Sequence, residues 1–270
     1  MSGMMRKLQI VAQMRLCVFI ITGGGSGLGK ALAHSLASRG KSVLIVGRRL
    51  EPLKETGSFS PLIDFLCADI STPEGIQLVV RRVADIAQIT ALINNAGSLQ
   101  PIAPLRELEG ARWHKTLSTN LDAALFLPQK LYKQLINGRV LNIGSGAAYF
   151  AIKGWATYCV SKAALSMLTK CWQLESEQVA FASVMPGIAD TDMQALAREA
   201  AHMDSEQTNF YKNLKHNNRL VSSETVAEFL TWILLEVDNQ TYQSKEWDIY
   251  DTSHHAAWLR APHEVPHWEG

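Results

Sequence analysis

Residues 16–29 read LCVFIITGGGSGLG, a short apolar run that passes directly into a glycine-rich turn. The run has the length and composition of a buried strand, and helical periodicity begins at Gly27. Glycine allows the tight turn and the close approach of a diphosphate, while the N-terminus of the following helix offers free N–H groups. This order predicts a phosphate-binding loop, although a glycine-rich loop without a ligand is the alternative. The predicted contacts are Gly23, Gly25, Ser26, Gly27, Leu28 and Gly29.

The alternation of apolar runs and helical segments continues along the chain. Further strands are predicted at 42–47, 62–67, 90–94, 139–144, 179–186 and 246–250, and helices at 27–39, 73–88, 106–136, 155–176 and 222–236. Strands that alternate with helices form parallel β-α-β units, and coverage of both sheet faces explains the continuous apolar runs. We therefore expect an α/β fold with one Rossmann-type, doubly wound parallel sheet of about seven strands, forming a single domain over 16–251.

Three segments stand apart from this pattern. Residues 1–15 form an N-terminal extension whose short apolar piece lacks the features of a signal peptide. The polar, methionine-containing stretch 188–221 is expected to be a helical insertion that serves as a substrate lid. Residues 252–270 carry four irregularly spaced histidines (His254, His255, His263 and His267), which favours a solvated tail over a metal site.

Composition narrows the classes of function. The formal net charge of +1 favours neither nucleic acid nor an acidic membrane as a partner. No stretch approaches the ~20 apolar residues of a membrane helix. The four cysteines form no C-x-x-C pair, so we expect no disulfide framework, no zinc site and reduced thiols in the cytoplasm.

The end of the second predicted strand indicates which dinucleotide binds. Arg48 and Arg49 follow Gly47, where proteins that bind NAD(H) typically carry a carboxylate. A guanidinium suits the extra 2′-phosphate of NADP(H), which we therefore favour over NAD(H); two solvated loop charges are the alternative. Asp69 and its neighbour Ile70, just after the third strand, are assigned to the adenine end, with an ordinary surface aspartate as the alternative.

A tyrosine four residues before a lysine places both side chains on one helix face, where the ammonium can stabilise a tyrosinate. The pairs Tyr149/Lys153, Tyr158/Lys162 and Tyr211/Lys215 all have this spacing. Only the second begins a strong predicted helix, and it follows Ser145, which stands at the carboxyl end of the fifth strand, where open α/β sheets bind ligands. This context selects Tyr158 as a general acid or base.

Taken together, these motifs resemble the short-chain dehydrogenase/reductase family over 16–251. The matching pieces are TGGGSGLG (22–29), the Asp69 turn, NNAG (94–97), TNL (119–121), Ser145, YCVSK (158–162) and PGIADT (186–191). The resemblance implies a catalytic tetrad of Asn120, Ser145, Tyr158 and Lys162. In this reading Tyr158 protonates the carbonyl, Lys162 holds the nicotinamide ribose and lowers the Tyr158 pKa, and Asn120 holds a water.

The resemblance also implies further cofactor contacts. Asn95, Ala96 and Gly97 would lie along the adenine ribose, and Pro186, Gly187, Ile188 and Thr191 would contact the nicotinamide. Ser26 departs from the pattern of many members that prefer NADP(H), which have a basic residue there, so Arg48 becomes the main anchor of the phosphate. Within the family, IGSGAA (143–148), GWATYCVSKAAL (154–165) and PGIADTDMQ (186–194) resemble the group that contains sepiapterin reductase and benzil reductase.

Apolar and aromatic side chains near Ser145, near Tyr158 and in the insertion are candidates for the substrate pocket; several of them are equally eligible as core or subunit contacts. They are Leu99, Phe150, Trp155, Met193, Phe210 and Tyr211. Such a lining suits a bulky or aromatic ketone, aldehyde or diketone. We expect a carbonyl reductase that forms a homodimer or homotetramer through 106–136 and 155–176, as family members commonly do. The alternative is an NADP(H)-binding regulator without turnover.

Overall fold

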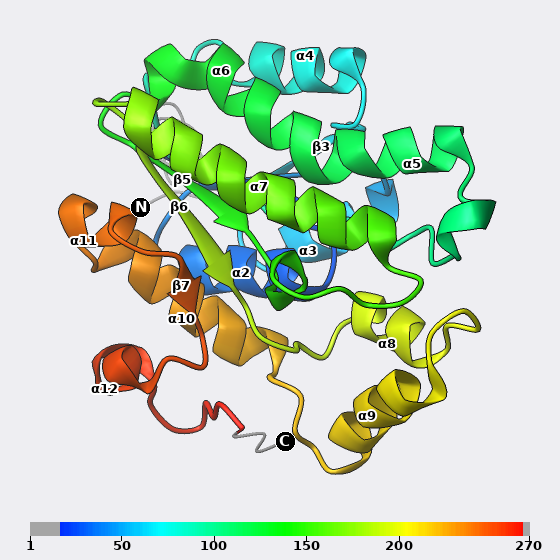
Figure 1. Ribbon diagram of the computed structural model, residues 1–270. Coiled ribbons are helices and arrows are strands. Elements are labelled where there is room, and N and C mark those ends of the chain that lie inside the picture. The colour runs from blue at the N-terminus through cyan, green and yellow to red at the C-terminus, as the bar shows by residue number, and fades with distance from the viewer. Residues whose placement is uncertain (1–16, 267–270) are drawn as a thin grey trace.

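The computed structural model describes residues 17–266 and contains one parallel sheet in the strand order β3-β2-β1-β4-β5-β6-β7 (Figure 1). The predicted extension 1–15 and His267 lie outside the described residues. The strands are β1 (Cys17–Thr22), β2 (Val43–Gly47), β3 (Ile63–Cys67), β4 (Gln88–Asn94), β5 (Arg139–Ile143), β6 (Ala180–Met185) and β7 (Trp247–Asp248). The predicted doubly wound Rossmann-type sheet is confirmed.

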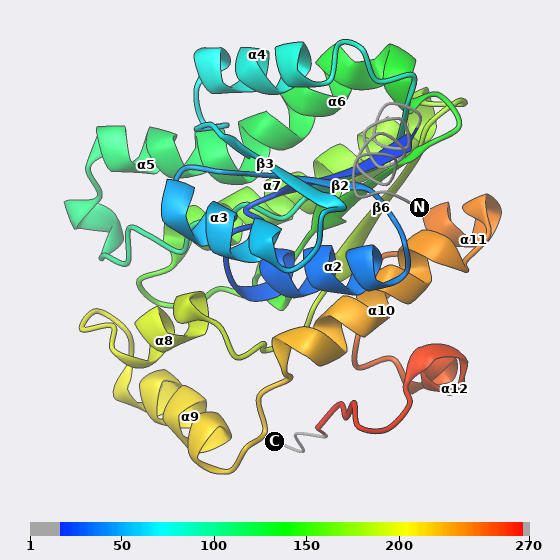
Figure 2. The same ribbon diagram turned by 180° about the vertical axis from the view of Figure 1, so that it is seen from behind.

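Helices cover both faces of the sheet (Figures 1 and 2). One layer holds α2 (Gly27–Ser38), α3 (Leu50–Ser58) and α10 (Ser223–Leu235); the other holds α4 (Pro73–Arg82), α5 (Gly110–Leu117), α6 (Ala123–Leu135) and α7 (Ala156–Glu175). Each layer forms its own apolar core against one sheet face, around Leu32 and Phe229 on the first and Leu127 and Phe181 on the second. Burial on both faces is why the strands read as continuous apolar runs.

Several boundaries differ from those predicted. The expected helix over 106–136 is interrupted by a π-helical turn, η2 (Ser118–Asp122), between α5 and α6, preceded by the short turn η1 (Leu105–Glu107). A π-turn inserts one residue into the helical ladder and changes which side chain faces inward. The helix α3 was not predicted, because LEPLKETGS contains few apolar residues and buries only Leu53 and Thr56. The last strand has two residues instead of five.

The segment 188–221 is helical, as expected, and contains α8 (Asp192–Arg198) and α9 (Ser205–His216). Its apolar residues form a third cluster with residues of the loop that precedes α7, among them Trp155, Met203 and Tyr211. This cluster lies beyond the carboxyl ends of the central strands, so it can border a ligand but does not support the sheet.

The expectation of a solvated C-terminal tail is wrong for the segment after β7. There η4 (Thr252–His254) and α12 (His255–Trp258) pack against α10, and His254 stacks on Phe229 with ring centroids 5.0 Å apart. The Trp258 indole N–H donates to His254 Nδ1 at 2.9 Å, and burial lowers the His254 pKa. The polar sequence TSHH gives no indication of this burial. A histidine can nevertheless be buried, because an imidazole whose two nitrogens are both hydrogen-bonded packs like an aromatic ring.

Two short helical elements complete the described chain, η3 (Gly146–Ala148) after β5 and α11 (Asn239–Gln243) before β7. No helix within residues 17–266 combines the length and apolarity needed to cross a bilayer.

Candidate active site

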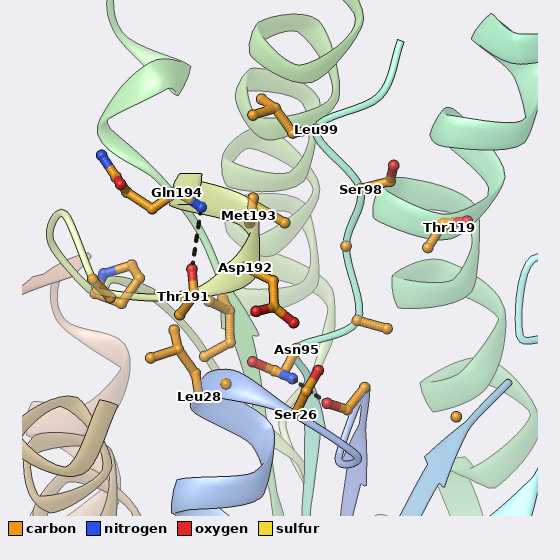
Figure 3. Close-up of a pocket in the computed structure, with 18 of the residues that line it drawn as sticks. Ser26, Leu28, Asn95, Ser98, Leu99, Thr119, Thr191, Asp192, Met193 and Gln194 are labelled. Carbon is orange, nitrogen blue, oxygen red and sulfur yellow. Dashed lines mark hydrogen bonds between the residues drawn. The ribbon is translucent and has the colours of Figure 1, made fainter. Parts of the chain in front are cut away.

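A cleft of about 500 Å³ runs along the carboxyl ends of the strands, at the place where the strand order reverses between β1 and β4. Open α/β sheets bind their ligands at this switch point. Figure 3 shows Ser26, Asn95 and Thr191 converging there from three separate segments of the chain. Every residue predicted to hold the cofactor lines the cleft except Gly29, which lies behind the loop.

The glycine loop is shaped by close backbone contacts. Gly23 and Gly27 adopt φ of +69° and +51°, a region that side chains disfavour. A Cβ at Gly29 would come within 2.4 Å of Gly23 O and 2.6 Å of Asn95 Nδ2. Glycine is therefore required at 29 for packing of the loop against the start of α2 and at 23 and 27 for the turn.

One residue missed by the sequence analysis, Thr22, ties this loop to the end of β4. Its Oγ1 accepts hydrogen bonds from the backbone N–H groups of Asn95 and Ala96, both at 3.0 Å, and donates to Ile93 O at 3.2 Å. The Asn95 amide in turn donates to Thr22 O at 2.8 Å. Thr22 is the first residue of the TGGGSGLG motif, and its place in that motif is the sequence signal for this role.

Arg48 and Arg49 both border the cleft and are exposed, which suits contact with a ligand phosphate. Arg49 donates to Ser26 Oγ at 3.3 Å, so the predicted anchor region and the glycine loop are in direct contact. Asp69 also borders the cleft; burial acts to raise its pKa, but hydrogen bonds from Lys115 and Ser71 outweigh burial and hold the pKa at about 2. Asp69 is thus a permanent carboxylate acceptor at neutral pH.

Asn120 lies in the π-helical turn η2, which directs its side chain inward, where it is buried. Its amide accepts from the Ser98 N–H at 2.8 Å and donates to Ser98 O at 2.9 Å and to Ser161 Oγ at 3.0 Å. These bonds join the loop after β4 to α7. The predicted role of Asn120 in holding a water stays a prediction.

Tyr158 and Lys162 lie on the inward face of α7, are both buried, and line the cleft together with Ser145. The Lys162 ammonium donates to Ile143 O at 2.6 Å and lies 5.6 Å from the centre of the Tyr158 ring. The structure thus brings three residues of the expected tetrad to one end of the cleft, whereas Asn120 is buried, bonded to Ser98 and Ser161, and is not part of the lining.

The predicted lowering of the Tyr158 pKa by Lys162 stays a prediction. Burial raises the pKa of Tyr158, and a hydrogen bond with Ser145 opposes that rise. Burial also lowers the pKa of Lys162 to about 8, because no carboxylate offsets the loss of hydration. Desolvation, which a sequence spacing cannot reveal, dominates both groups.

The other two tyrosine–lysine pairs do not form such a site. Tyr149 and Lys153 lie in the irregular segment after η3, and Tyr149 is 57% exposed. Tyr211 and Lys215 lie on α9, but Lys215 pairs with Asp190 at 2.6 Å and Tyr211 turns into the cleft. Burial raises the pKa of Tyr211 to about 12, so its phenol stays protonated.

Four of the six predicted substrate residues line the cleft: Leu99, Trp155, Met193 and Tyr211. Phe210 instead packs against Tyr211 with ring centroids 5.5 Å apart, and Phe150 is 59% exposed and is absent from the lining. Residues that were not predicted also border it, including Ser98, Ile143 and Gln194.

Trp155 connects the loop before α7 to the insertion. Its ring stacks on Tyr211 at 5.8 Å and meets Tyr158 edge to face at 5.8 Å, while its indole N–H donates to Met203 Sδ at 3.1 Å. An ion pair of 2.5 Å between Lys153 and Asp204 reinforces the same contact. The insertion is therefore held against the helix that carries the phenol.

The cleft fits a dinucleotide. At one end the glycine loop leaves the backbone unobstructed, since φ at Gly23 and Gly27 excludes side chains. At the other end Tyr158 and Lys162 lie beside Pro186 and the neighbouring Gly187. A diphosphate at the glycine loop would place the reactive end of the molecule near the phenol.

A sequence profile of the short chain dehydrogenase family matches residues 17–202. This chain therefore belongs to the short-chain dehydrogenase/reductase family and is an NAD(P)-dependent oxidoreductase.

Individual relatives agree with this placement. A benzil reductase ((S)-benzoin forming) of Bacillus cereus is 30% identical, with 80% of this chain and 92% of the relative covered. Sepiapterin reductase of Meriones unguiculatus is 33% identical, with 87% and 96% covered. The crystal structure of a short-chain dehydrogenase/reductase from Saccharomyces cerevisiae superposes with a TM-score of 0.83 at 28% identity, covering 89% of this chain and 99% of that one.

Proposed function

We propose that this protein is an NADP(H)-dependent carbonyl reductase in which Tyr158 protonates the carbonyl oxygen. One observation carries the proposal: the buried phenol of Tyr158 lines the cleft together with Ser145, with Lys162 one helical turn away on α7. The phenol carries its proton at neutral pH; because burial alone makes Tyr158 a weaker acid, we assign stabilisation of the resulting tyrosinate to Lys162.

Each residue of the tetrad has a role in this proposal. The bound nicotinamide supplies the hydride. Ser145 Oγ and the Tyr158 hydroxyl donate hydrogen bonds to the carbonyl oxygen, which draws electrons from its carbon. Tyr158 then transfers its proton to that oxygen, and the Lys162 ammonium stabilises the tyrosinate that remains. Asn120 holds α7 against the loop after β4 through its bonds to Ser98 and Ser161.

The preference for NADP(H) over NAD(H) is part of the proposal. It is supported by two exposed guanidinium groups, Arg48 and Arg49, that border the cleft at the end of β2. Arginine binds phosphate through two parallel hydrogen bonds and is always charged. The hydrogen bond from Arg49 to Ser26 keeps this region next to the glycine loop.

The proposed substrate is a bulky or aromatic ketone, aldehyde or diketone. The part of the cleft beyond Tyr158 is bordered by Leu99, Trp155, Met193 and Tyr211, so apolar and aromatic surface surrounds the position of the carbonyl. Aromatic rings offer stacking surface, and methionine adapts to different shapes. The insertion 188–221 is proposed as the lid of this pocket.

We further propose a cytoplasmic enzyme that assembles as a homodimer or homotetramer through residues 106–136, which contain α5 and α6, and through α7. The described cysteines, Cys67, Cys159 and Cys171, are free thiols, as is usual in a reducing compartment. Apolar side chains exposed on α7, among them Met167 and Leu174, would be covered in such an assembly.

The decisive experiment is a screen of aromatic ketones, aldehydes and 1,2-diketones with NADPH and with NADH, followed at 340 nm and by chiral analysis of the alcohol. We expect turnover of at least one aromatic diketone, and a higher kcat/KM with NADPH. Tight NADPH binding without oxidation by any carbonyl compound would reject the reductase and favour a regulator.

A further inference from the structure

A carboxylate outside the tetrad, Glu246, gathers hydroxyl groups from three segments around it. Its Oε1 accepts from Ser183 Oγ on β6 at 2.8 Å, and its Oε2 accepts from the Tyr149 hydroxyl. Ser166 Oγ on α7 lies 2.9 Å from the Tyr149 oxygen and 3.5 Å from Oε2. Glu246 immediately precedes β7 and is 97 residues from Tyr149 in the chain.

Ser145 and Tyr149 stand at the two ends of the short loop that contains η3. The Ser145 side chain accepts from the Ala147 N–H at 3.2 Å, its carbonyl accepts from the Ala148 N–H at 3.0 Å, and Gly146 O accepts from the Tyr149 N–H at 2.9 Å. These bonds make the turn η3 a compact unit. Fixing the Tyr149 hydroxyl therefore fixes the far end of the unit whose near end carries the Ser145 Oγ.

The carboxylate also contacts the near end of this loop. A Cβ built on Gly144, the residue before Ser145, would lie 3.2 Å from Glu246 Oε1. The Gly144 N–H donates to Val184 O at 2.8 Å, which aligns the same backbone with β6. Glu246 Oε1 thus lies close to the residue that precedes Ser145.

The third partner of the network belongs to the catalytic helix. Ser166 follows Lys162 by four residues and Tyr158 by eight, so the three lie along one face of α7, and all three are buried. Through Tyr149 and Ser166, Glu246 connects the segment that carries Ser145 to the helix that carries the phenol.

We propose that Glu246 is a positioning residue that, through Tyr149 and Ser166, sets the distance between Ser145 and Tyr158. A carboxylate suits this role because it offers two acceptor oxygens and no donor, so hydroxyl groups from different segments must orient toward it. The inference rests on the proposed function, since the alignment of Ser145 with Tyr158 matters most for proton transfer. A misplacement of about 1 Å in such a pair costs about 10²-fold in rate.

The test compares Tyr149→Phe, Glu246→Gln and Glu246→Ala with a matched control, Tyr132→Phe. Tyr132 also shares a hydrogen bond with a serine of the α7 region, Ser176, at 2.9 Å, but far from the cleft. The side chain of Tyr149 is mostly exposed, so removal of its hydroxyl group in Tyr149→Phe is expected to leave folding intact. Measurements are kcat, KM, NADPH affinity, the pH profile of kcat, and hydrogen exchange.

We expect kcat to fall about tenfold in Tyr149→Phe and Glu246→Ala, less in Glu246→Gln, and not in Tyr132→Phe, with NADPH affinity unchanged in all four. Because the hydrogen bond with Ser145 lowers the Tyr158 pKa, a displaced Ser145 should move the alkaline limb of the kcat profile to higher pH. Amide exchange should rise within 144–149 in Tyr149→Phe and Glu246→Ala only.

Unchanged kcat, pH profile and exchange in Tyr149→Phe and Glu246→Ala would overturn the positioning role, and so would equal losses in the Tyr132→Phe control. If the unsubstituted protein reduces no carbonyl compound, the proposed function fails by itself. The exchange data then decide the positioning role: faster exchange confined to 144–149 supports it, and unchanged exchange rejects it.

Discussion

At the scale of single residues, burial controls the chemistry of the site more than nearby charge does. It raises the pKa of Tyr158 and lowers that of Lys162 to about 8, so each group is pushed toward its neutral form. Tyr158 therefore holds its proton at neutral pH, and transferring that proton requires stabilisation of the tyrosinate. A lysine with a pKa of about 8 remains mostly protonated at pH 7 and can still stabilise a tyrosinate.

The first prediction concerns the proton donor. Tyr158→Phe should bind NADPH as the unsubstituted protein does, because the ring and its contact with Trp155 remain. Turnover should fall by about 10² or more, the contribution of a positioned general acid. Fluorescence titration and steady-state kinetics measure the two quantities; near-normal turnover would disprove the assigned role.

The second prediction concerns Lys162 and pH. Its pKa is about 8 in the folded protein and ~10.4 in an unfolded chain, so between these values the unfolded state binds more protons and stability rises with pH. In Lys162→Met this contribution is absent. The free energy of unfolding of the unsubstituted protein, relative to the variant, should therefore increase from pH 8 to pH 10 in urea titrations. A constant difference would contradict the depressed pKa.

The third prediction separates the two dinucleotides. Arg48→Ala removes a guanidinium at the end of β2 and should weaken NADPH by about tenfold or more, the scale of a lost charged hydrogen bond, while affecting NADH little. Isothermal titration with both dinucleotides measures this difference. Arg106→Ala, which removes an exposed arginine on η1 outside the cleft lining, is the control. Equal weakening of both dinucleotides by Arg48→Ala would refute a 2′-phosphate contact.

At the scale of elements, the site depends on how the ends of helices and strands meet. The glycine loop between β1 and α2 is locked to the end of β4 through Thr22 and Asn95. The π-turn η2 turns Asn120 inward, where it joins the loop after β4 to α7. Trp155 then joins α7 to the insertion through Tyr211. Each junction couples a ligand-binding loop to a rigid element.

The fourth prediction tests the tightest of these junctions. In Gly29→Ala the new methyl would collide with Gly23 O and Asn95 Nδ2, atoms of the backbone and of a fixed amide. The loop must shift, so we expect loss of NADPH binding and destabilisation of about 1–3 kcal/mol. Gly110→Ala, at the start of α5 with open space around it, should be neutral or slightly stabilising. Thermal unfolding with and without NADPH distinguishes these outcomes.

At the scale of the whole molecule, one helix face remains uncovered. Val160, Met167 and Leu174 recur every seven residues along α7 and are 47%, 59% and 88% exposed. Phe126 on the neighbouring α6 is also exposed. A stripe of exposed apolar side chains on a folded surface is typical of a subunit interface, which agrees with the assembly proposed above.

The fifth prediction follows from this stripe. Met167→Glu places a charge in its centre and should reduce the molecular mass measured by light scattering to that of a monomer, because burying an unpaired carboxylate is costly. Leu105→Glu replaces another exposed apolar side chain, on η1, and should leave the mass unchanged. A monomer in the unsubstituted protein would exclude the proposed assembly.

Local patterns in the sequence were sufficient for the fold class and for singling out Tyr158 and Lys162. The strand before the glycine turn, the helix after it, and the spacing of Tyr158 and Lys162 depend only on residues a few positions apart. The structure confirms the parallel sheet and places Ser145, Tyr158 and Lys162 in the lining of one cleft, while Asn120 is bonded to Ser98 of that lining. Such patterns can be interpreted from sequence because helix and strand geometry determine which residues, at a given spacing, lie on the same face of the element.

Only the tertiary structure decided the features that join distant segments. It removed Phe150 from the pocket lining, buried His254 among aromatic rings, and made desolvation the dominant effect on the Tyr158 pKa. It also brought Glu246 to Tyr149 across 97 residues. These outcomes depend on which surfaces pack together and exclude water. That packing cannot be inferred from the spacing of residues along the chain.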